Sequence, residues 1–197
     1  WMGYLSTTGV YGDHAGGWVD EDTPLTPEGQ RGIWRLQAEQ QWRATGLLTV
    51  FQDTGRHGQA GQGVSASGAM DQVALKTANR LVGNASHVAA LETVGGGLQL
   101  KSRGDNVVAV TGADAPITIT TSQGQRWNVS RYAPIALADG DTLSIAQPVA
   151  GARCYVAVRG GFNVAPVLGS CSTDTLAHVG PAALKVGDVL TVQAATH

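Results

Sequence analysis

Glycine occurs 27 times in this 197-residue chain, while charged residues make up only 14% of it. Glycine permits the tight turns that join short strands, whereas long surface helices use many more charged side chains. From residue 46 onward, short runs rich in Val, Ile and Thr alternate with turn signals such as Gly140-Asp141 and Gly187-Asp188. The chain is therefore expected to be mainly β with few helices, as a barrel or sandwich of short strands.

One helix is expected to interrupt these strands. Residues 71–82 carry apolar side chains at helical spacing, and Gly83 follows as a residue that tolerates a left-handed cap. A single turn is expected over 86–90. The apolar positions of the helix are Val73, Leu75, Ala78, Leu81 and Val82, and the expected strands are 47–51, 107–111, 117–121, 135–137, 142–145, 154–158 and 189–192.

Residues 1–45 have a different pattern from the rest, with a strand end, a polar loop and one helix over 30–45. On that helix Trp34, Ala38 and Trp42 fall four apart on one face. We therefore expect a short strand-loop-helix α/β fragment ahead of the β-rich segment.

Charge and cysteine usage exclude several classes of function. The net charge is -2 and the basic residues are scattered, which argues against a nucleic-acid partner. No apolar run is long enough for a membrane span and no signal peptide is recognisable, so a cytoplasmic protein without a membrane partner is expected. Cys154 and Cys171 are too few for a disulfide framework, and the dispersed histidines predict no metal site.

The block Gln52-Asp53-Thr54-Gly55-Arg56 predicts a turn that holds an arginine on a stiff base. Asp53 and Thr54 can bond nearby backbone amides, and Gly55 can take a positive φ. A rigid guanidinium can grip a carboxylate or a carboxylated ureido group with two parallel hydrogen bonds. The alternative is that Arg56 pairs with a local acid and only braces the turn.

Other polar positions have two interpretations each. Ser67 or Asp71 can cap the helix, or the amides between them can attract an anion. Asn79 and Asn84 can close backbone hydrogen bonds at the helix end or contact a substrate amide. Glu92 can form a buried ion pair with Arg56 or Arg80, or it can act as an acid catalyst. Cys171, in the block 169–174, could act as a nucleophile only with a base such as His178 nearby.

These blocks, with 155–162 and 169–174, resemble the opening of the allophanate hydrolase subunit 2 family. That family is the biotin-dependent carboxyltransferase half that also occurs as the C subunit of bacterial 5-oxoprolinase, and the resemblance covers residues 46–197. It implies an incomplete cyclophilin-like β-barrel, a small-molecule substrate and a partner subunit resembling allophanate hydrolase subunit 1. Biotin or ATP is implied as cofactor, biotin for the carboxylase members and ATP for the 5-oxoprolinase members.

Within this resemblance, Arg56 and Asp71 are the candidate catalytic residues. The family pattern has an arginine where this chain has Cys171. The candidate substrate-binding residues are Gln52, Ser67, Asn79, Glu92 and Ser172.

Residues 1–45 resemble part of an atypical extended short-chain dehydrogenase of the NAD-dependent epimerase group. The tyrosine and lysine of that family fall on Arg31 and Arg35 here, and a guanidinium cannot serve as a general base. No glycine-rich dinucleotide motif follows a strand, so no dehydrogenase activity is expected. Two incomplete resemblances in one chain leave three hypotheses: a subunit of a carboxyltransferase or 5-oxoprolinase complex, a regulatory binding protein that antagonises a kinase inhibitor, or a non-functional chimeric fragment.

Overall fold

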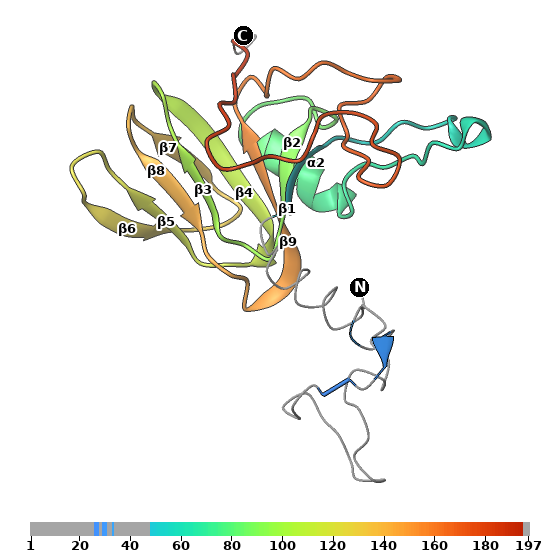
Figure 1. Cartoon of the computed structure of the whole chain (residues 1–197). Helices are drawn as coiled ribbons and strands as arrows, with labels where there is room; N and C mark the ends of the chain where they lie inside the picture. Colours follow the sequence, from blue (N-terminus) through green and yellow to red (C-terminus); the bar gives the residue numbers. More distant parts are fainter. Residues whose placement is uncertain (1–25, 28, 31–32, 34–47, 195–197) are drawn as a thin grey trace. The chain divides into compact units, whose positions relative to one another are not determined.

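A computed structural model of the chain describes residues 26–27, 29–30, 33 and 48–194 (Figure 1). The chain divides into two compact units, Trp1–Gly46 and Leu47–His197. In the first unit, the Ile33 amide donates to the Gly29 carbonyl at 2.9 Å, the spacing of a helical turn. The rest of the expected strand, loop and helix of 1–45 lies outside the described residues.

Two antiparallel sheets form the second unit. One follows the order β1-β2-β9-β4-β7 and the other β3-β8-β5-β6 (Figure 1). No strand pairing between the described residues joins the two sheets, so they do not form a closed barrel. The strands are β1 (Leu48–Gln52), β2 (Ala90–Val94), β3 (Leu98–Lys101), β4 (Asn106–Asp114), β5 (Ile117–Thr120), β6 (Arg126–Val129), β7 (Pro134–Leu137), β8 (Thr142–Ile145) and β9 (Ala150–Val158).

The main core combines alternate side chains of both sheets. Phe51 and Leu91 from the first sheet belong to the same buried cluster as Ile119 and Leu143 from the second. Phe162, just after β9, closes one end of this core by packing edge-on against Phe51, with ring centroids 5.6 Å apart. The mainly β expectation is confirmed, because strand alternation places one apolar face of each sheet in this core.

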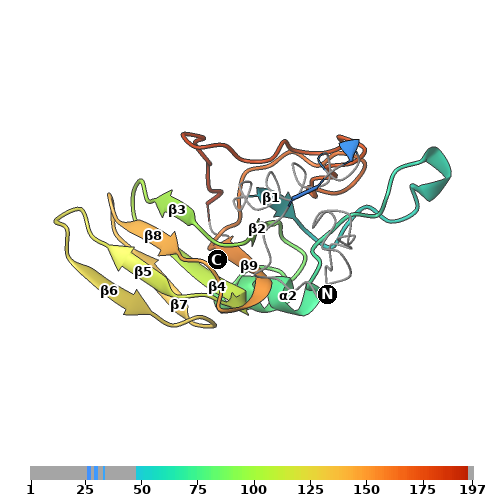
Figure 2. The ribbon, with the colours of Figure 1, turned by 60° about the horizontal axis from the view of Figure 1, so that its bottom comes forward.

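Helix α2 (Gln72–Leu81) covers the opposite face of the first sheet (Figure 2). Its buried residues Leu75 and Ala78 pack with Ala109 and Tyr155 of the sheet. Asp71 caps the helix by accepting the Ala74 amide at 2.9 Å. The predicted helix and the left-handed Gly83 are confirmed, at φ +82 for that glycine. Val73 was expected on the apolar face but is 73% exposed.

Most predicted strands are present, and the turn near 86–90 is formed by a bond from the Val88 amide to the Ala85 carbonyl at 3.1 Å. The prediction of a strand over 189–192 is wrong. That segment pairs with the chain just after β9 over a single residue pair, an isolated antiparallel bridge between Val192 and Phe162. The sequence also failed to predict β2, β3 and β6. Polar or charged side chains interrupt all three, as in Arg126–Val129, which is largely exposed.

The segment that follows β9, residues 162–184, returns across the edge of β1, and we call it the strap. Its Thr173 amide donates to the Phe51 carbonyl at 2.8 Å, and its Leu184 amide donates to the Thr49 carbonyl at 2.8 Å. These bonds occupy the side of β1 that faces away from β2, which would otherwise be an open strand edge. Within the described residues, no helix is long and apolar enough to cross a membrane.

Candidate functional site

The site begins where β1 ends and the chain makes the predicted turn over 53–56. Gly55 has φ +93, and a Cβ there would press on the backbone oxygens of Ala66 and Ser67. The Arg56 amide donates to the Ala66 carbonyl at 2.7 Å, and the Ala69 amide donates to the Asp53 carbonyl at 2.9 Å. Glycine is required at position 55 because the two loop segments approach this closely.

The Asp53 carboxylate ties this turn to the strap. Oδ1 accepts hydrogen bonds from the hydroxyls of Ser170 and Ser172, each at 2.6 Å, and from the Gly55 amide at 2.7 Å. Oδ2 accepts the Cys171 amide at 2.7 Å. Burial alone would raise the pKa of Asp53, but these four hydrogen bonds outweigh it and lower the pKa below its ordinary value. Asp53 is therefore a charged anchor whose two oxygens are already engaged.

Arg56 lies beneath the strap and is only 2% exposed. Its Nη2 donates to the Ser172 carbonyl, and its Nε donates to the Val167 carbonyl at 3.4 Å. Its Nη1 is buried and has no hydrogen-bond partner. Across the described residues, no carboxylate forms an ion pair with Arg56, so the alternative of a local acid bracing the turn does not describe this structure.

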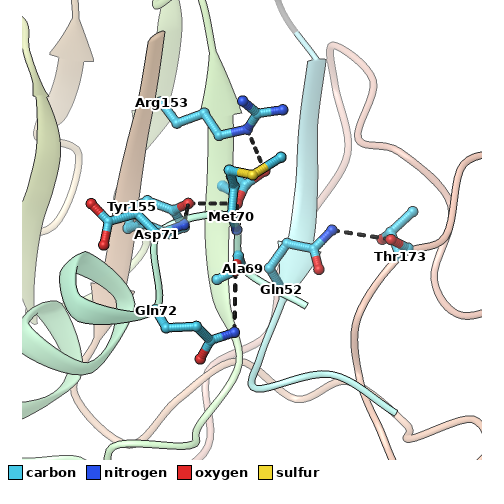
Figure 3. A network of polar contacts seen from close by, with 9 residues as sticks. Gln52, Ala69, Met70, Asp71, Gln72, Arg153, Tyr155 and Thr173 are labelled. Atoms are coloured by element: carbon cyan, nitrogen blue, oxygen red, sulfur yellow. Dashed lines mark hydrogen bonds and ion pairs between the residues drawn. The ribbon is translucent and has the colours of Figure 1, made fainter. Parts of the chain in front are cut away.

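Gln52 and Thr173 complete this part of the site (Figure 3). The Gln52 Nε2 donates to the Thr173 carbonyl at 3.0 Å, which fixes the orientation of the amide. Gln52 Oε1 and Thr173 Oγ1 are both buried without a partner. The predicted residues Gln52 and Arg56 thus both donate to the strap, to the adjacent carbonyls of Thr173 and of the predicted residue Ser172. Thr173 was missed, because a threonine in a loop carries no signal of its own.

Ser67 lies beside this cluster but does not cap α2. Its hydroxyl donates to Asp174 Oδ2 at 3.1 Å, and the Ser65 hydroxyl donates to the same oxygen at 2.6 Å. Asp174 Oδ1 also accepts the amides of Leu176 and Ala177, each at 2.9 Å. The Ser65 hydrogen bond is the largest cause that lowers the pKa of Asp174 to about 2. Asp174 is thus a second carboxylate that joins the loop before α2 to the strap.

Glu92 of β2 is hydrogen-bonded to Arg153, Tyr155 and Met70, three residues that Figure 3 labels. Its Oε1 accepts Arg153 Nε at 2.9 Å, and its Oε2 accepts the Tyr155 hydroxyl at 2.7 Å and the Met70 amide at 3.0 Å. The expected buried ion pair is present, but its partner is Arg153 of β9 rather than Arg56 or Arg80. Sequence spacing could not predict the pairing of Glu92 with Arg153. It depends on the register between β2 and β9, which is set by tertiary contacts.

The same network fixes the start of α2. The Tyr155 hydroxyl accepts the Asp71 amide at 2.8 Å while it donates to Glu92. Burial and the neighbouring Glu92 carboxylate raise the pKa of Tyr155 far above its ordinary value, so the phenol keeps its proton. Asp71 is thus placed as a helix cap, in a different hydrogen-bond network from that of Arg56.

Asn79 and Asn84 close the other end of α2. Asn79 is fully buried and its Nδ2 donates to the Val88 carbonyl at 2.7 Å. Asn84 donates to the Val158 carbonyl at 2.8 Å and accepts the Gly160 amide at 2.9 Å. The Asn84 contacts satisfy backbone groups at the end of β9, whereas Asn79 bonds to the loop after α2 and makes no hydrogen bond to the strap.

Cys171 is half-buried in the strap. Burial and the nearby Asp53 carboxylate raise the pKa of its thiol, and its Sγ donates to the Val164 carbonyl at 3.4 Å. A raised pKa disfavours the thiolate that a nucleophile needs, and the one hydrogen bond of the thiol goes to this carbonyl rather than to His178.

In the described part of the chain, no group of three or more His, Cys, Asp or Glu side chains could hold a metal ion.

Comparison with known proteins gives a consistent result. The model of the family described as "Carboxyltransferase domain, subdomain A and B" matches residues 62–197. The chain is 39% identical over 150 residues to the C subunit of 5-oxoprolinase from Escherichia coli, covering 75% of this chain and 47% of that protein. It is 39% identical over 149 residues to the urea amidolyase of Saccharomyces cerevisiae, covering 74% of this chain and 8% of that one.

A solved structure shares the fold. The urea amidolyase of K. lactis superposes with a TM-score of 0.68 at 36% identity, over 74% of this chain and 9% of that chain. The chain thus spans about half the length of its bacterial relative and a small part of the fungal proteins.

Proposed function

The chain belongs to the carboxyltransferase domain family, subdomains A and B, and on that premise we propose that it contributes to a multi-subunit enzyme acting on a small amide or lactam. The relatives among 5-oxoprolinase C subunits and urea amidolyases support a role in a complex of this kind. The observation that carries the proposal is Arg56, a buried guanidinium with a free Nη1 and no carboxylate partner in the described residues. Such a group suits an anionic substrate or intermediate.

We propose that the group which Arg56 contacts is a carboxyl carrier rather than a nucleotide. A nucleotide triphosphate needs several cations or a cradle of backbone amides, whereas this site has one buried cation beside the Asp53 carboxylate. Arg56 is therefore not proposed as a phosphate ligand, and the ATP of a 5-oxoprolinase-type complex would bind elsewhere in that complex. A ureido group such as that of biotin fits better, because Arg56 Nη1 could donate to its carbonyl oxygen and Gln52 Oε1 could accept its N–H. When bound, biotin would supply a carrier for a carboxyl group.

The proposed partner is a subunit resembling allophanate hydrolase subunit 1. We further propose that residues 46–197 carry the function and that residues 1–45, with their dehydrogenase-like pattern, do not contribute to it. A variant that lacks residues 1–45 should then bind the partner as well as the full chain does. Loss of binding on that deletion would contradict this division of roles.

The experiment is co-expression of the chain with such a partner, followed by a measurement of 5-oxoproline-dependent ATP hydrolysis. Arg56→Lys keeps a charge but loses the forked donors, so turnover should fall by at least about tenfold. Arg103→Lys, at an exposed position, is the matched control and should leave turnover unchanged. A folded, complex-forming Arg56→Lys variant with full turnover would show that Arg56 only holds the strap. Complex formation without any turnover would favour a regulatory binding role.

A further inference from the structure

An open cleft lies beside the strand that ends the second sheet. Among the described residues, β3 pairs only with β8, and β6 forms the other end of that sheet (Figure 2). The cleft has a volume of about 1370 Å³ and is lined by β3, by the ends of β7 and β9 and by the chain segment 187–194. That volume exceeds the roughly 300–1,000 Å³ typical of a small-molecule site, so the cleft suits a larger ligand.

The floor of the cleft is apolar. Val108, Val156 and Val158 of the first sheet line it, and all three belong to the main core. On the 187–194 side, Leu190 is only partly buried against that core and Val189 is 62% exposed. The cleft therefore opens onto the core and leaves apolar side chains uncovered, as in a surface that binds a partner.

Strand pairing shows which backbone groups of β3 face the cleft. The Ser102 amide donates to the Asp141 carbonyl at 2.7 Å, in register with the ladder between β3 and β8. Successive residues of an antiparallel strand direct their backbone groups alternately to its two sides. Leu100 therefore bonds to β8, while Gln99 and Lys101 direct their N–H and C=O groups to the opposite side. Both of these residues line the cleft, and no strand of the described residues pairs with them there.

The other neighbour of β8 gives the same result. The Ala146 amide donates to the Pro116 carbonyl at 2.9 Å, in register with the ladder between β5 and β8. By the same alternation, Thr142 and Ser144 bond to β5, which leaves Leu143 to bond to β3. The open edge of β3 therefore follows from two independent hydrogen bonds.

Charge distinguishes between the strands that could add to this edge. Lys101 is exposed on β3 and Arg103 follows it, and neither forms an ion pair with a carboxylate of the described residues. Residues directly opposite each other in paired strands have side chains on the same face, so an acidic residue opposite Lys101 is favoured. A second copy of β3 would instead bring another lysine to the same short edge, which discourages pairing. Asp105 and Asp188 also line the cleft, but neither belongs to β3.

We propose that the cleft binds an extended segment of a partner protein, in which apolar residues alternate with acidic ones, and that this segment adds to β3 as a further strand. Its backbone exchanges hydrogen bonds with Gln99 and Lys101, and its acidic side chains lie beside Lys101. Its apolar side chains face the same way as Leu100 and cover the floor at Val156 and Val158. This docking site goes beyond the proposed function and does not depend on it.

The test uses the peptide acetyl-Thr-Val-Glu-Val-Glu-Val-Thr-amide as its probe, with amide NMR of the isotope-labelled full chain. The amide signals of Gln99 and Lys101 should shift, and those of β6 should not. A peptide N-methylated on the backbone nitrogens of both glutamates should bind about tenfold more weakly, because the N–H groups that face β3 are lost. If β3 does not respond, or if the N-methylated peptide binds equally well, the proposal fails.

Proline variants test the strand edge itself. Gln99→Pro removes an open N–H of β3 without removing a bond to β8, so binding should weaken about fivefold. Asn128→Pro is the matched control on β6. The Thr121 amide donates to the Gln125 carbonyl at 2.8 Å, so by the same alternation Asn128 directs its N–H away from β5. This control should bind the peptide as the unmodified chain does, and an equal loss in both variants would contradict docking at β3.

Charge variants, which leave the backbone unchanged, test the choice of partner. Lys101→Glu should reverse the preference between the glutamate peptide and its lysine counterpart, whereas Arg126→Glu, at an exposed position of β6, should not. A glutamate preference that survives Lys101→Glu would refute the acidic partner. Sedimentation should show a monomeric chain; a dimer that Gln99→Pro dissociates would mean that a second copy occupies the edge, contrary to the proposal.

Discussion

At the scale of single residues, two carboxylates hold the loops of the site together. Asp53 binds the hydroxyls of Ser170 and Ser172, more than a hundred residues later in the chain, and Asp174 binds the hydroxyls of Ser65 and Ser67. Each is a charge-assisted contact and stronger than a bond between neutral groups. The polar block at 52–56 therefore has a structural task as well as the proposed binding task.

Asp53→Asn tests that structural task. The asparagine side chain has one acceptor oxygen where the aspartate has two, so at least one hydroxyl or backbone amide loses its hydrogen-bond acceptor. The free energy of unfolding should therefore fall by about 2 kcal/mol. Because the folded pKa lies below the ordinary 3.8, the carboxylate stabilises the fold fully above that pH, and the contribution is lost as pH falls through the folded pKa. Urea unfolding at several pH values should show a shallower acid dependence for the variant.

Asp105→Asn is the matched control, because Asp105 is exposed and does not belong to the Asp53 contacts. It should change stability and its acid dependence little. An Asp53→Asn variant as stable as the unmodified chain, with the same acid dependence, would mean that the strap is held by its other bonds.

The sequence indicated some of the site and not the rest. The turn at 53–56 was predictable because Asp, Gly and Arg have clear local roles, and the structure confirms the φ of Gly55 and the backbone bond of Asp53. The pairing of Glu92 with Arg153 was not predictable, since it depends on strand register between segments about sixty residues apart. Asn79 has the residue type of a binding group, yet its amide is used by the backbone of the loop after α2.

At the scale of secondary structure, the strands that the sequence predicts have either a continuous apolar run or an apolar residue at every second position. Strand β8 (Thr142–Ile145) has the predicted bounds, and β4 (Asn106–Asp114) and β9 (Ala150–Val158) extend the predicted runs by several residues. Strand β2 was missed because buried Glu92 and Thr93 interrupt its apolar pattern. The short edge strand β6 was missed because its side chains are largely exposed, so nothing in its composition required a strand.

Strand β4 contains a bulge that depends on a single glycine. The register with β9 shifts between Gly112 and Asp114, and Gly112 has φ +95. A Cβ at this position would meet the carbonyl oxygen of Arg153 on the neighbouring strand. The bulge also presents the carbonyls of Gly112 and Ala113 to Arg131 Nη1, at 2.9 and 3.0 Å.

Gly112→Ala should therefore destabilise the second unit by about 3 kcal/mol, the sum of a left-handed backbone penalty and a clash with a strand that cannot move freely. Gly104→Ala is the matched control, because its φ of +77 carries the same backbone penalty with open space around the new Cβ. It should cost only about 1 kcal/mol. Thermal and urea unfolding of the two variants give the comparison, and equal losses would show that the bulge accommodates a side chain.

At the scale of the whole second unit, long-range contacts between β1 and the strap bring the site together. The strap contributes Ser170, Ser172 and Thr173, and the end of β1 contributes Gln52 and Asp53, so neither segment forms the site alone. The strap also protects the free edge of β1 through the bonds to Phe51 and Thr49. Stability and binding therefore depend on the same segment.

Two deletions test this dependence. Removing residues 163–197 takes away the strap and exposes the edge of β1, so the melting temperature should fall by about 10 °C or more and the protein should aggregate. Removing residues 186–197 keeps the bonds of Asp53, Thr173 and Leu184 and loses the bridge between Phe162 and Val192, so a fall of about 5 °C is expected. Calorimetry and light scattering measure both effects. If the shorter deletion were as damaging as the longer one, residues 186–194 rather than the strap would be what protects the sheet.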